Sequence, residues 1–291
     1  MEVYARAGAV FLLFLGLCIH FSVAVAAVPT PRGADLSAQG AIVLCFETGE
    51  ELFAYNADIP RAPASIVKMM PIYLALEAIE AGRFTMDCIV PISQRAHNVS
   101  LDTGQTNVRL TRTRAYTVRE IIDVTSVVSA GGASIALAEL VGGSEYGFFQ
   151  MANDKVDEWG IHAFFQSASG GTLPTFLTPR AMAELTRNII TRFPAVLAHT
   201  GPPYVRFQGQ RFNHHVPGRF PGMDGFKTGS NNTAGFNFAG TAQREGTRVI
   251  SMVMGSTHPR RFDDTAILLN YGFYAIEVRR QQAAMEEGYW W

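Results

Sequence analysis

The segment Pro63-Ala-Ser-Ile-Val-Lys-Met-Met70 leads from a proline-containing loop into an apolar helix that Gly82 ends. Residues three apart on a helix share a face, so the hydroxyl of Ser65 and the amine of Lys68 point the same way. A serine at a helix N-terminus lies where backbone N–H groups stabilise a developing oxyanion. A desolvated lysine one turn later can lose its proton and act as a base. The segment predicts a serine nucleophile with a lysine base; the alternative is a capping serine followed by a surface lysine.

A second segment, Asp224-Gly-Phe-Lys-Thr-Gly-Ser230, lies on a predicted strand. Lys227 and Thr228 place a cation and a hydroxyl directly before Gly229, which suits recognition of a carboxylate along an edge strand. The glycine removes a side chain where a substrate must approach the backbone. The chain has only three lysines, and two of them, Lys68 and Lys227, fall in these two segments.

Strand patterns stand at both ends of the chain, with helical patterns between them. Turn residues and apolar runs predict strands over 40–46, 51–55, 225–230, 235–242 and 247–255, the last two joined as a hairpin. Helical spacing and its boundaries predict helices from 65 to 81, within 117–159, over 179–192 and over 261–286. We expect one catalytic unit with two lobes, a mixed sheet lobe flanked by helices and a helical insertion.

The two segments together form a known pattern, because SxxK followed by KTG is typical of serine β-lactamases and penicillin-binding proteins. Residues 63–70 are similar to PASxxKMM, residues 135–144 to ALAExxGGS, and residues 221–237 to PGxDGxKTG followed by AGFN. From about residue 35 to residue 280 the chain resembles the D-alanyl-D-alanine carboxypeptidases, low-molecular-weight penicillin-binding proteins of peptidase family S11. The resemblance implies an α/β (α+β) fold of β-lactamase/transpeptidase type, with an antiparallel sheet flanked by helices and a helical insertion lobe.

The resemblance also implies an activity and a role for each site residue. The enzyme would remove the terminal D-alanine of peptidoglycan stem peptides ending in D-Ala-D-Ala, through an acyl-enzyme that β-lactams also form, without cofactor or metal. Ser65 would be the nucleophile and Lys68 its general base, while Ser129 would relay a proton to the leaving D-alanine. Lys227, Thr228 and Gly229 would bind the terminal carboxylate. The N–H groups of Ser65 and Ser230 would form the oxyanion hole.

The second motif departs from the family pattern. Where the family has S-x-N-D-A, this chain has Ser129-Ala-Gly-Gly-Ala133, so Gly131 replaces the asparagine whose amide would hold Lys68 and the substrate carbonyl. Losing such a hydrogen bond costs about 1–3 kcal/mol. We expect the glycine to leave room for a water in that place. Two alternatives follow: a catalytically impaired peptidoglycan-binding homologue and, less favoured, a β-lactamase. The second is disfavoured because residues 159–183 contain no Asp or Glu that could activate a deacylating water.

The N-terminus predicts export. Arg6, an apolar run over 9–19 and the small residues Ala24 to Ala26 fit a signal peptide over residues 1–27, which leaves 28–291 as the catalytic domain of a periplasmic or cell-envelope protein. An uncleaved N-terminal anchor is the alternative. Cys45 is expected on a buried strand, and a bridge to Cys88 stays open.

Composition excludes other classes. With 24 basic and 25 acidic residues the net charge is −1, so the sequence offers no excess of positive charge that would bind nucleic acid. The adjacent His214 and His215 would face opposite sides of a strand, so we expect a structural or surface role for them and no metal site. The aromatic tail, 289–291, is expected to be a packed or frayed terminus, and peripheral membrane contact is its alternative.

Overall fold

Strands from both ends of the chain form one antiparallel sheet in the computed structural model, which describes residues 29–171 and 175–288. The order β2-β1-β7-β6-β5 places the N-terminal hairpin beside a C-terminal meander and leaves β5 at an edge. The bounds are β1 (Gly40–Cys45), β2 (Glu51–Tyr55), β5 (Met223–Asn231), β6 (Gly235–Arg244) and β7 (Thr247–Ser256). All five predicted strands are confirmed, as is the antiparallel sheet that the family resemblance implied. The mixed sheet expected from the order of strands and helices along the chain was wrong, because every neighbouring pair of this sheet runs antiparallel.

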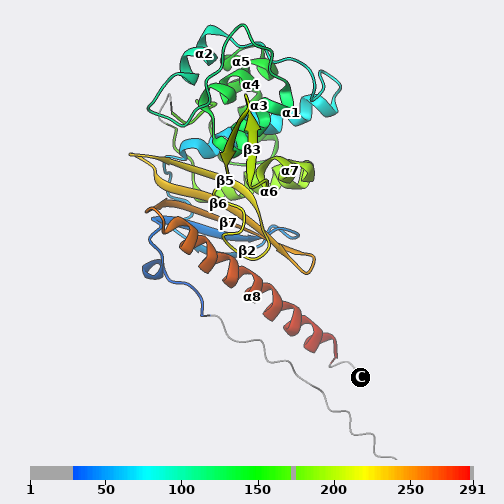
Figure 1. Ribbon diagram of the computed structural model, residues 1–291. Helices are drawn as coiled ribbons and strands as arrows, with labels where there is room; N and C mark the ends of the chain where they lie inside the picture. The colour runs from blue at the N-terminus through cyan, green and yellow to red at the C-terminus, as the bar shows by residue number, and fades with distance from the viewer. Residues whose placement is uncertain (1–28, 172–174, 289–291) are drawn as a thin grey trace, which may run out of the picture.

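Helices cover both faces of this sheet (Figure 1). On one face α8 (Arg261–Gly288) packs on a cluster that includes Ala41 and Val43, and on the other α6 (Pro179–Arg192) packs against β1 and β7. Alternate residues of a strand point to opposite faces. A strand between two helical layers is therefore apolar throughout, and every residue of β1 is buried.

The helical insertion forms a second lobe above the sheet in Figure 1. Its buried residues continue into the core between the sheet and α6, so the two lobes share one hydrophobic cluster. The helices of this lobe, with the short ones near it, are η2 (Ala64–Lys68), α1 (Met69–Glu80), α2 (Gln94–Ser100), α3 (Val118–Asp123), η3 (Val124–Val128), α4 (Gly131–Gly142), α5 (Glu145–Glu158), η4 (Pro194–Val196) and α7 (Leu197–Thr200). A further short helix, η1 (Gly33–Asp35), precedes β1.

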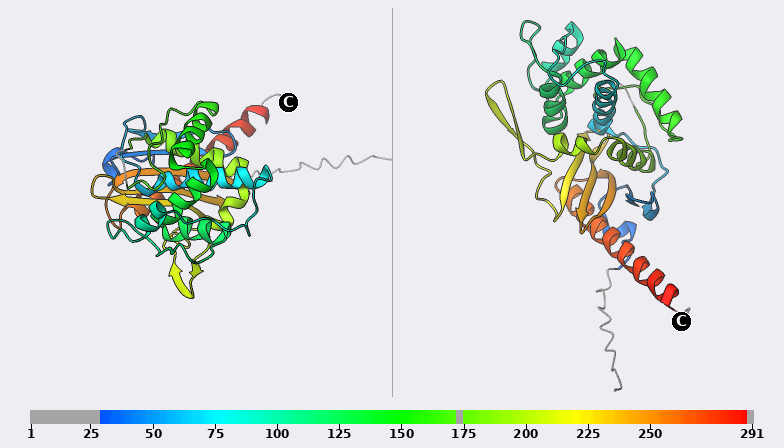
Figure 2. Two further views of the ribbon diagram at one scale, coloured as in Figure 1. Left: turned by 90° about the horizontal axis from the view of Figure 1, so that it is seen from above. Right: turned by 90° about the vertical axis from the view of Figure 1, so that its right-hand side faces the viewer.

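Two features were not predicted from the sequence. Helix α2 is a short polar helix, and its N-cap Ser93 accepts a hydrogen bond from Ala96 N–H. The hairpin of β3 (Tyr204–Phe207) and β4 (Gln210–Asn213) projects from the body beside the cleft described below (Figure 2). Its strands are short and partly exposed, so they lack the apolar alternation that marks the central strands.

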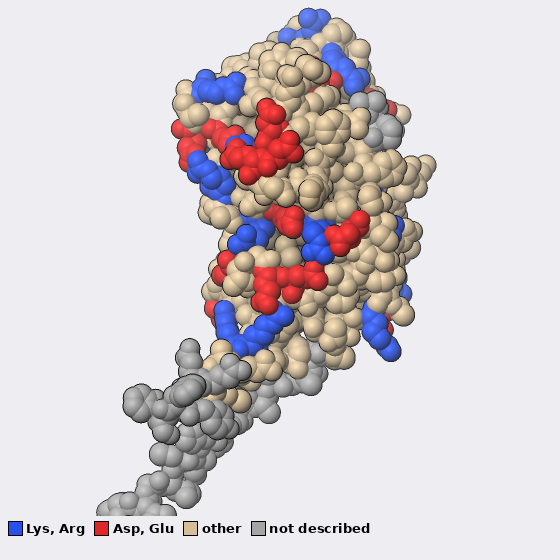
Figure 3. Space-filling view, turned by 180° about the vertical axis from the view of Figure 1, so that it is seen from behind, with Lys and Arg blue, Asp and Glu red and all other residues tan. Residues whose placement is uncertain are grey.

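Several remaining expectations concern the surface and the termini. On the face shown in Figure 3, acidic and basic side chains are interspersed over the part that the structure describes, without an extended basic expanse. Among the described residues, no helix is both long and apolar enough to cross a membrane. The predicted signal peptide over 1–27 and the aromatic tail over 289–291 lie outside the described residues. Cys45 is buried on β1 as expected, and Cys45 and Cys88 are both free.

Candidate active site

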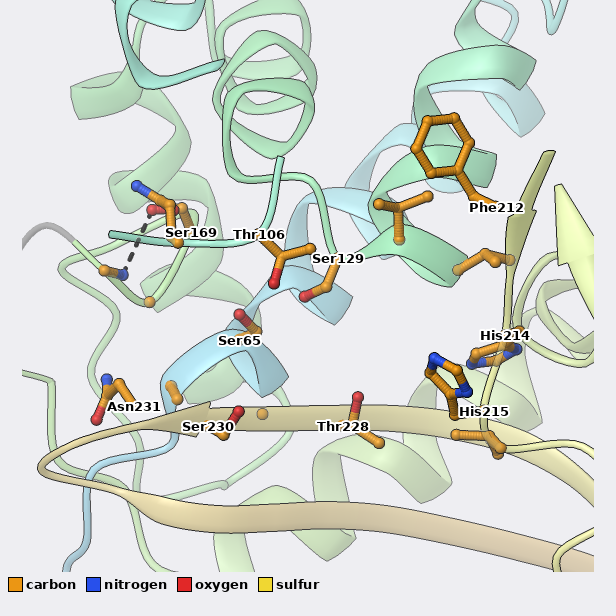
Figure 4. Close-up of a pocket in the computed structure, with 18 of the residues that line it drawn as sticks. Ser65, Thr106, Ser129, Ser169, Phe212, His214, His215, Thr228, Ser230 and Asn231 are labelled. Atoms are coloured by element: carbon orange, nitrogen blue, oxygen red, sulfur yellow. Dashed lines mark hydrogen bonds between the residues drawn. The ribbon is translucent and has the colours of Figure 1, made fainter. Parts of the chain in front are cut away.

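A cleft of about 710 Å³ lies between the two lobes, at the outer edge of β5. Figure 4 shows Ser65 of η2 at its centre, with Thr106 and Ser129 on the side of the helical lobe and Thr228 and Ser230 of β5 on the side of the sheet. Both sequence segments that predicted chemistry thus meet at one site. None of the described residues lining the cleft is Asp or Glu.

Ser65 and Lys68 lie on one turn of η2 and are in direct contact. Lys68 Nζ lies 2.6 Å from Ser65 Oγ and donates a second hydrogen bond of 2.6 Å to the carbonyl oxygen of Ser169. The lysine side chain is fully buried, and burial lowers the pKa of its amine to about 7. The pair sits on a 3-10 helix that continues into α1, where the sequence predicted the start of an α-helix. Ala64, directly before the serine, has a left-handed φ of 49°, a strained conformation of the kind found at functional sites.

Lys227 connects β5 to the second motif. Its Nζ donates hydrogen bonds of 2.9 Å to Ser129 Oγ and to the carbonyl oxygen of Thr228. Burial and the nearby charges of Lys68 and Arg261 hold the pKa of Lys227 well below its usual value. An anion bound beside this amine would favour its charged form, so the site is suited to a negatively charged ligand.

Gly229 is required by packing between η2 and β5. A Cβ at this position would lie 2.7 Å from the carbonyl oxygen of Pro63 and 3.1 Å from the backbone nitrogen of Ile66. A glycine was expected here because substrate must approach the backbone. The structure adds a second reason, because a side chain would collide with the segment that carries Ser65. The glycine therefore sets the distance between the nucleophile and the edge strand.

The second motif lies at the junction of η3 and α4. Ser129 has a left-handed φ of 66°, and its hydroxyl points into the cleft. The expected space for a water at Gly131 is not there, since a Cβ on this glycine would collide with Oε1 of Gln105 and lie 2.7 Å from its Cδ. The prediction of an empty, water-filled place was wrong, because a side chain from the preceding loop fills it.

Four further lining groups were not predicted as part of the site. They are Gln105, Ser169, the histidine pair and Arg261. His214 and His215 follow β4 and both line the cleft (Figure 4), so the expectation that they face opposite sides of a strand was wrong. Burial lowers the pKa of His214 to about 4. The Nε and Nη1 atoms of Arg261 are buried without a hydrogen-bond partner among the described residues. No motif marked these residues, since each reaches the cleft from a loop or a helix start distant in sequence.

The described residues include no cluster of three or more His, Cys, Asp or Glu side chains that could hold a metal ion. The chemistry of the cleft is that of hydroxyls, amines and backbone N–H groups. Such groups suit nucleophilic attack on a carbonyl carbon, because N–H groups can stabilise the negative charge that develops on the carbonyl oxygen.

Comparison with known families gives a match over most of the chain. The sequence model of the peptidase S11 family, described as D-alanyl-D-alanine carboxypeptidase, matches residues 25–258. Two curated relatives are the D-alanyl-D-alanine carboxypeptidases DacF of Bacillus subtilis, 26% identical over 83% of this chain, and DacC of Escherichia coli, 28% identical over 88%. The matched part spans 63% and 66% of the length of these relatives.

Solved structures share the fold. PBP3 of Streptococcus pneumoniae, described as a peptidoglycan synthesis regulatory factor, has a TM-score of 0.76 at 33% identity, over 81% of this chain and 73% of that one. Penicillin-binding protein D2 of Listeria monocytogenes in the ampicillin-bound form has a TM-score of 0.74 at 31% identity, over 84% and 99%.

Proposed function

The chain belongs to the D-alanyl-D-alanine carboxypeptidase family, peptidase family S11, and we propose that it removes the terminal D-alanine from peptidoglycan stem peptides through an acyl-enzyme on Ser65. The observation that carries this proposal is the contact of 2.6 Å between a fully buried Lys68 amine and the Ser65 hydroxyl. An amine whose pKa lies near 7 is neutral in part of the molecules at physiological pH, and it can take the serine proton.

Acylation follows from this arrangement. Lys68 takes the proton of the Ser65 hydroxyl as Oγ bonds to the carbonyl carbon of the penultimate D-alanine. The N–H groups of Ser65 and Ser230 stabilise the oxyanion; β5 is an edge strand, so part of its N–H groups face the cleft rather than another strand. The bond to the terminal D-alanine nitrogen breaks as that nitrogen receives a proton through Ser129. Lys68, neutral again, then takes a proton from a water as the water oxygen bonds to the ester carbon, and it passes this proton to Ser65 Oγ as the ester bond breaks and the shortened peptide leaves.

The cations at the sheet side of the cleft bind the terminal carboxylate. Lys227 and the hydroxyl of Thr228 are the residues of the KTG segment in this role, and Arg261 adds a guanidinium with two unpartnered nitrogens. A carboxylate here would offset the mutual repulsion of these buried positive charges. The enzyme should therefore prefer substrates that end in a free carboxylate.

β-Lactams would acylate the same serine as substrate analogues. The relative from Listeria monocytogenes is described in an ampicillin-bound form, which supports this expectation. The cleft lining that the structure describes offers no carboxylate like the one that activates the deacylating water in class A β-lactamases. Because the opened β-lactam ring stays attached to the acyl group, we expect a penicilloyl ester on Ser65 to persist longer than the peptidyl ester. Persistence favours a penicillin-binding peptidase over a β-lactamase.

The proposal is tested by two assays on the same preparation. Release of D-alanine from a peptide ending in D-Ala-D-Ala measures the peptidase activity, and labelling by a fluorescent penicillin measures acylation. We expect both in the parent chain and neither in Ser65→Ala. Labelling without D-alanine release would instead identify an impaired penicillin-binding homologue.

Export belongs to the same proposal, because stem peptides lie outside the cytoplasm. We expect residues 1–27 to direct the chain to the periplasm or cell envelope. N-terminal sequencing of protein recovered from the envelope fraction should begin near residue 28. Intact protein that keeps residues 1–27 would indicate an uncleaved anchor, and cosedimentation with lipid vesicles would reveal a contact of the aromatic tail.

A further inference from the structure

The place of the lost second-motif asparagine is occupied by another carboxamide. Asparagine at position 131 would begin at the Cβ that Gly131 lacks, and Oε1 of Gln105 lies too close to that point for a Cβ to fit beside it. The same oxygen lies 3.2 Å from the position of a Cβ on Gly171, two residues after the carbonyl of Ser169 that binds Lys68. Gln105 is thus inserted between the start of α4 and the loop that holds the general base.

Four interactions fix this loop and its glutamine. Asp102 accepts hydrogen bonds from Gly104 N–H, at 2.8 Å, and from Gln105 Nε2, at 2.9 Å. The N–H groups at the start of α4 donate to the loop in turn, from Gly131 to the carbonyl oxygen of Thr106 at 3.1 Å and from Gly132 to Asn107 Oδ1 at 2.9 Å. The carboxamide is therefore oriented with its nitrogen toward Asp102 and its oxygen toward Gly131.

The oxygen end of this carboxamide lacks a partner. Oε1 of Gln105 is buried, and no described residue donates a hydrogen bond to it. Buried acceptors are nearly always satisfied, so an orphaned one in a cleft points to a donor that arrives with a ligand. Lys68 is not that donor in the free site, since its hydrogen bonds go to Ser65 and Ser169.

We propose that Gln105 replaces the second-motif asparagine, and that its carboxamide binds an amide group of the peptide that acylates Ser65. The ligand's N–H satisfies Oε1, and this contact keeps the scissile carbonyl in line with Ser65. The inference rests on the proposed function, because it assigns a residue to that reaction. It also explains how the chain tolerates Gly131, since the glycine provides the space into which Gln105 extends.

Moving the carboxamide from position 105 to position 131 tests the proposal. Gln105→Ala should lower kcat/KM for D-Ala-D-Ala peptide about 10- to 100-fold, the effect of one or two hydrogen bonds made in the transition state. In the double variant Gln105→Ala with Gly131→Asn, the new side chain enters the vacated space and restores most of that loss. Gln94→Ala, at an exposed glutamine of α2 outside the cleft, is the matched control and should keep the parent rate.

The outcomes separate this inference from the function on which it rests. A parent rate in Gln105→Ala, or a double variant no faster than Gln105→Ala at an unchanged melting temperature, would overturn the role of Gln105 while the function stands. A shifted pH midpoint of kcat/KM in Gln105→Ala would mean that the residue acts through Lys68, which contradicts the substrate contact. If the parent chain neither releases D-alanine nor binds penicillin, the proposed function is wrong, and the role of Gln105 falls with it.

Discussion

The two sides of the cleft are built in different ways. On the sheet side, η2 and β5 carry Ser65, Lys68 and Lys227 in short motifs whose spacing reflects a helical turn and a strand. On the helical side, Ser129 and Gly131 are completed by a loop that comes earlier in the chain and is bound to α4 by one backbone and one side-chain hydrogen bond. Local motifs hold the nucleophile and base, whereas the opposing wall depends on tertiary contacts. We therefore expect loss of the nucleophile or the base to have a larger effect than any change in the opposing wall.

The largest expected effect is the change of the acylation rate with pH, which depends on Lys68. Lys68 must be neutral to take a proton, and burial places its pKa at about 7, so the neutral fraction rises as the pH increases through that value. The acylation rate by fluorescent penicillin should increase about tenfold per unit from pH 5 and level off above about pH 7. A rate independent of pH across this range would mean that Lys68 is not the base.

The next largest effect is expected from the substitution of Lys227. Lys227→Ala removes a buried cation from the proposed carboxylate site, so kcat/KM for peptides with a free C-terminus should fall about 10- to 100-fold. Amidated peptides should already be poor substrates of the parent chain. Lys155→Ala, at a lysine paired with Glu77 and Glu158 outside the cleft, is the control and should leave the rate unchanged. Equal turnover of free and amidated peptides would contradict the assigned role of Lys227.

Gly229 tests whether packing sets the position of the nucleophile. In Gly229→Ala the new methyl meets backbone atoms of Pro63 and Ile66, so η2 and β5 must move apart. We expect the acylation rate to fall about tenfold together with a lower melting temperature. A variant with the parent rate and stability would show that this contact does not control the site.

The smallest effect on the peptide rate is expected for a substitution at Gly131. From the family pattern alone, Gly131→Asn would be expected to add the absent amide and raise the peptide rate. The structure reverses the expectation, because in the parent chain the asparagine would compete with Gln105 for one place. We expect no gain, and a loss of about twofold to fivefold. An increase of tenfold or more would mean that the space is open and that Gln105 does not fill it.

The sequence predicted the sheet and the nucleophile because their signals are local. Strand β1 is a continuous apolar run, β7 is largely apolar, and α6 follows the N-cap Thr178 with Pro179 at its first position. The contact between Ser65 and Lys68 follows from their spacing on one turn. These features could be deduced without knowing what packs against them.

The remaining features depend on contacts between distant segments. Gln105 lies in a loop with no motif, and its role arises only because Asp102 orients it and Gly131 leaves it room. His214 and His215 enter the cleft from a hairpin whose partly exposed strands carry no strong periodicity. The packing of Gly229 against Pro63 likewise follows only from the folded structure, because the two residues are far apart in the sequence.

The most direct test of the account is the site of acylation. After incubation with benzylpenicillin, intact-mass analysis should show one adduct per chain, and peptide mapping should locate it on the fragment that contains Ser65. The adduct should be absent from Ser65→Ala and present in Ser144→Ala, a serine that caps α5 outside the cleft. An adduct that survives Ser65→Ala, or a folded parent chain that forms none, would contradict the assignment of Ser65 and Lys68 as nucleophile and base.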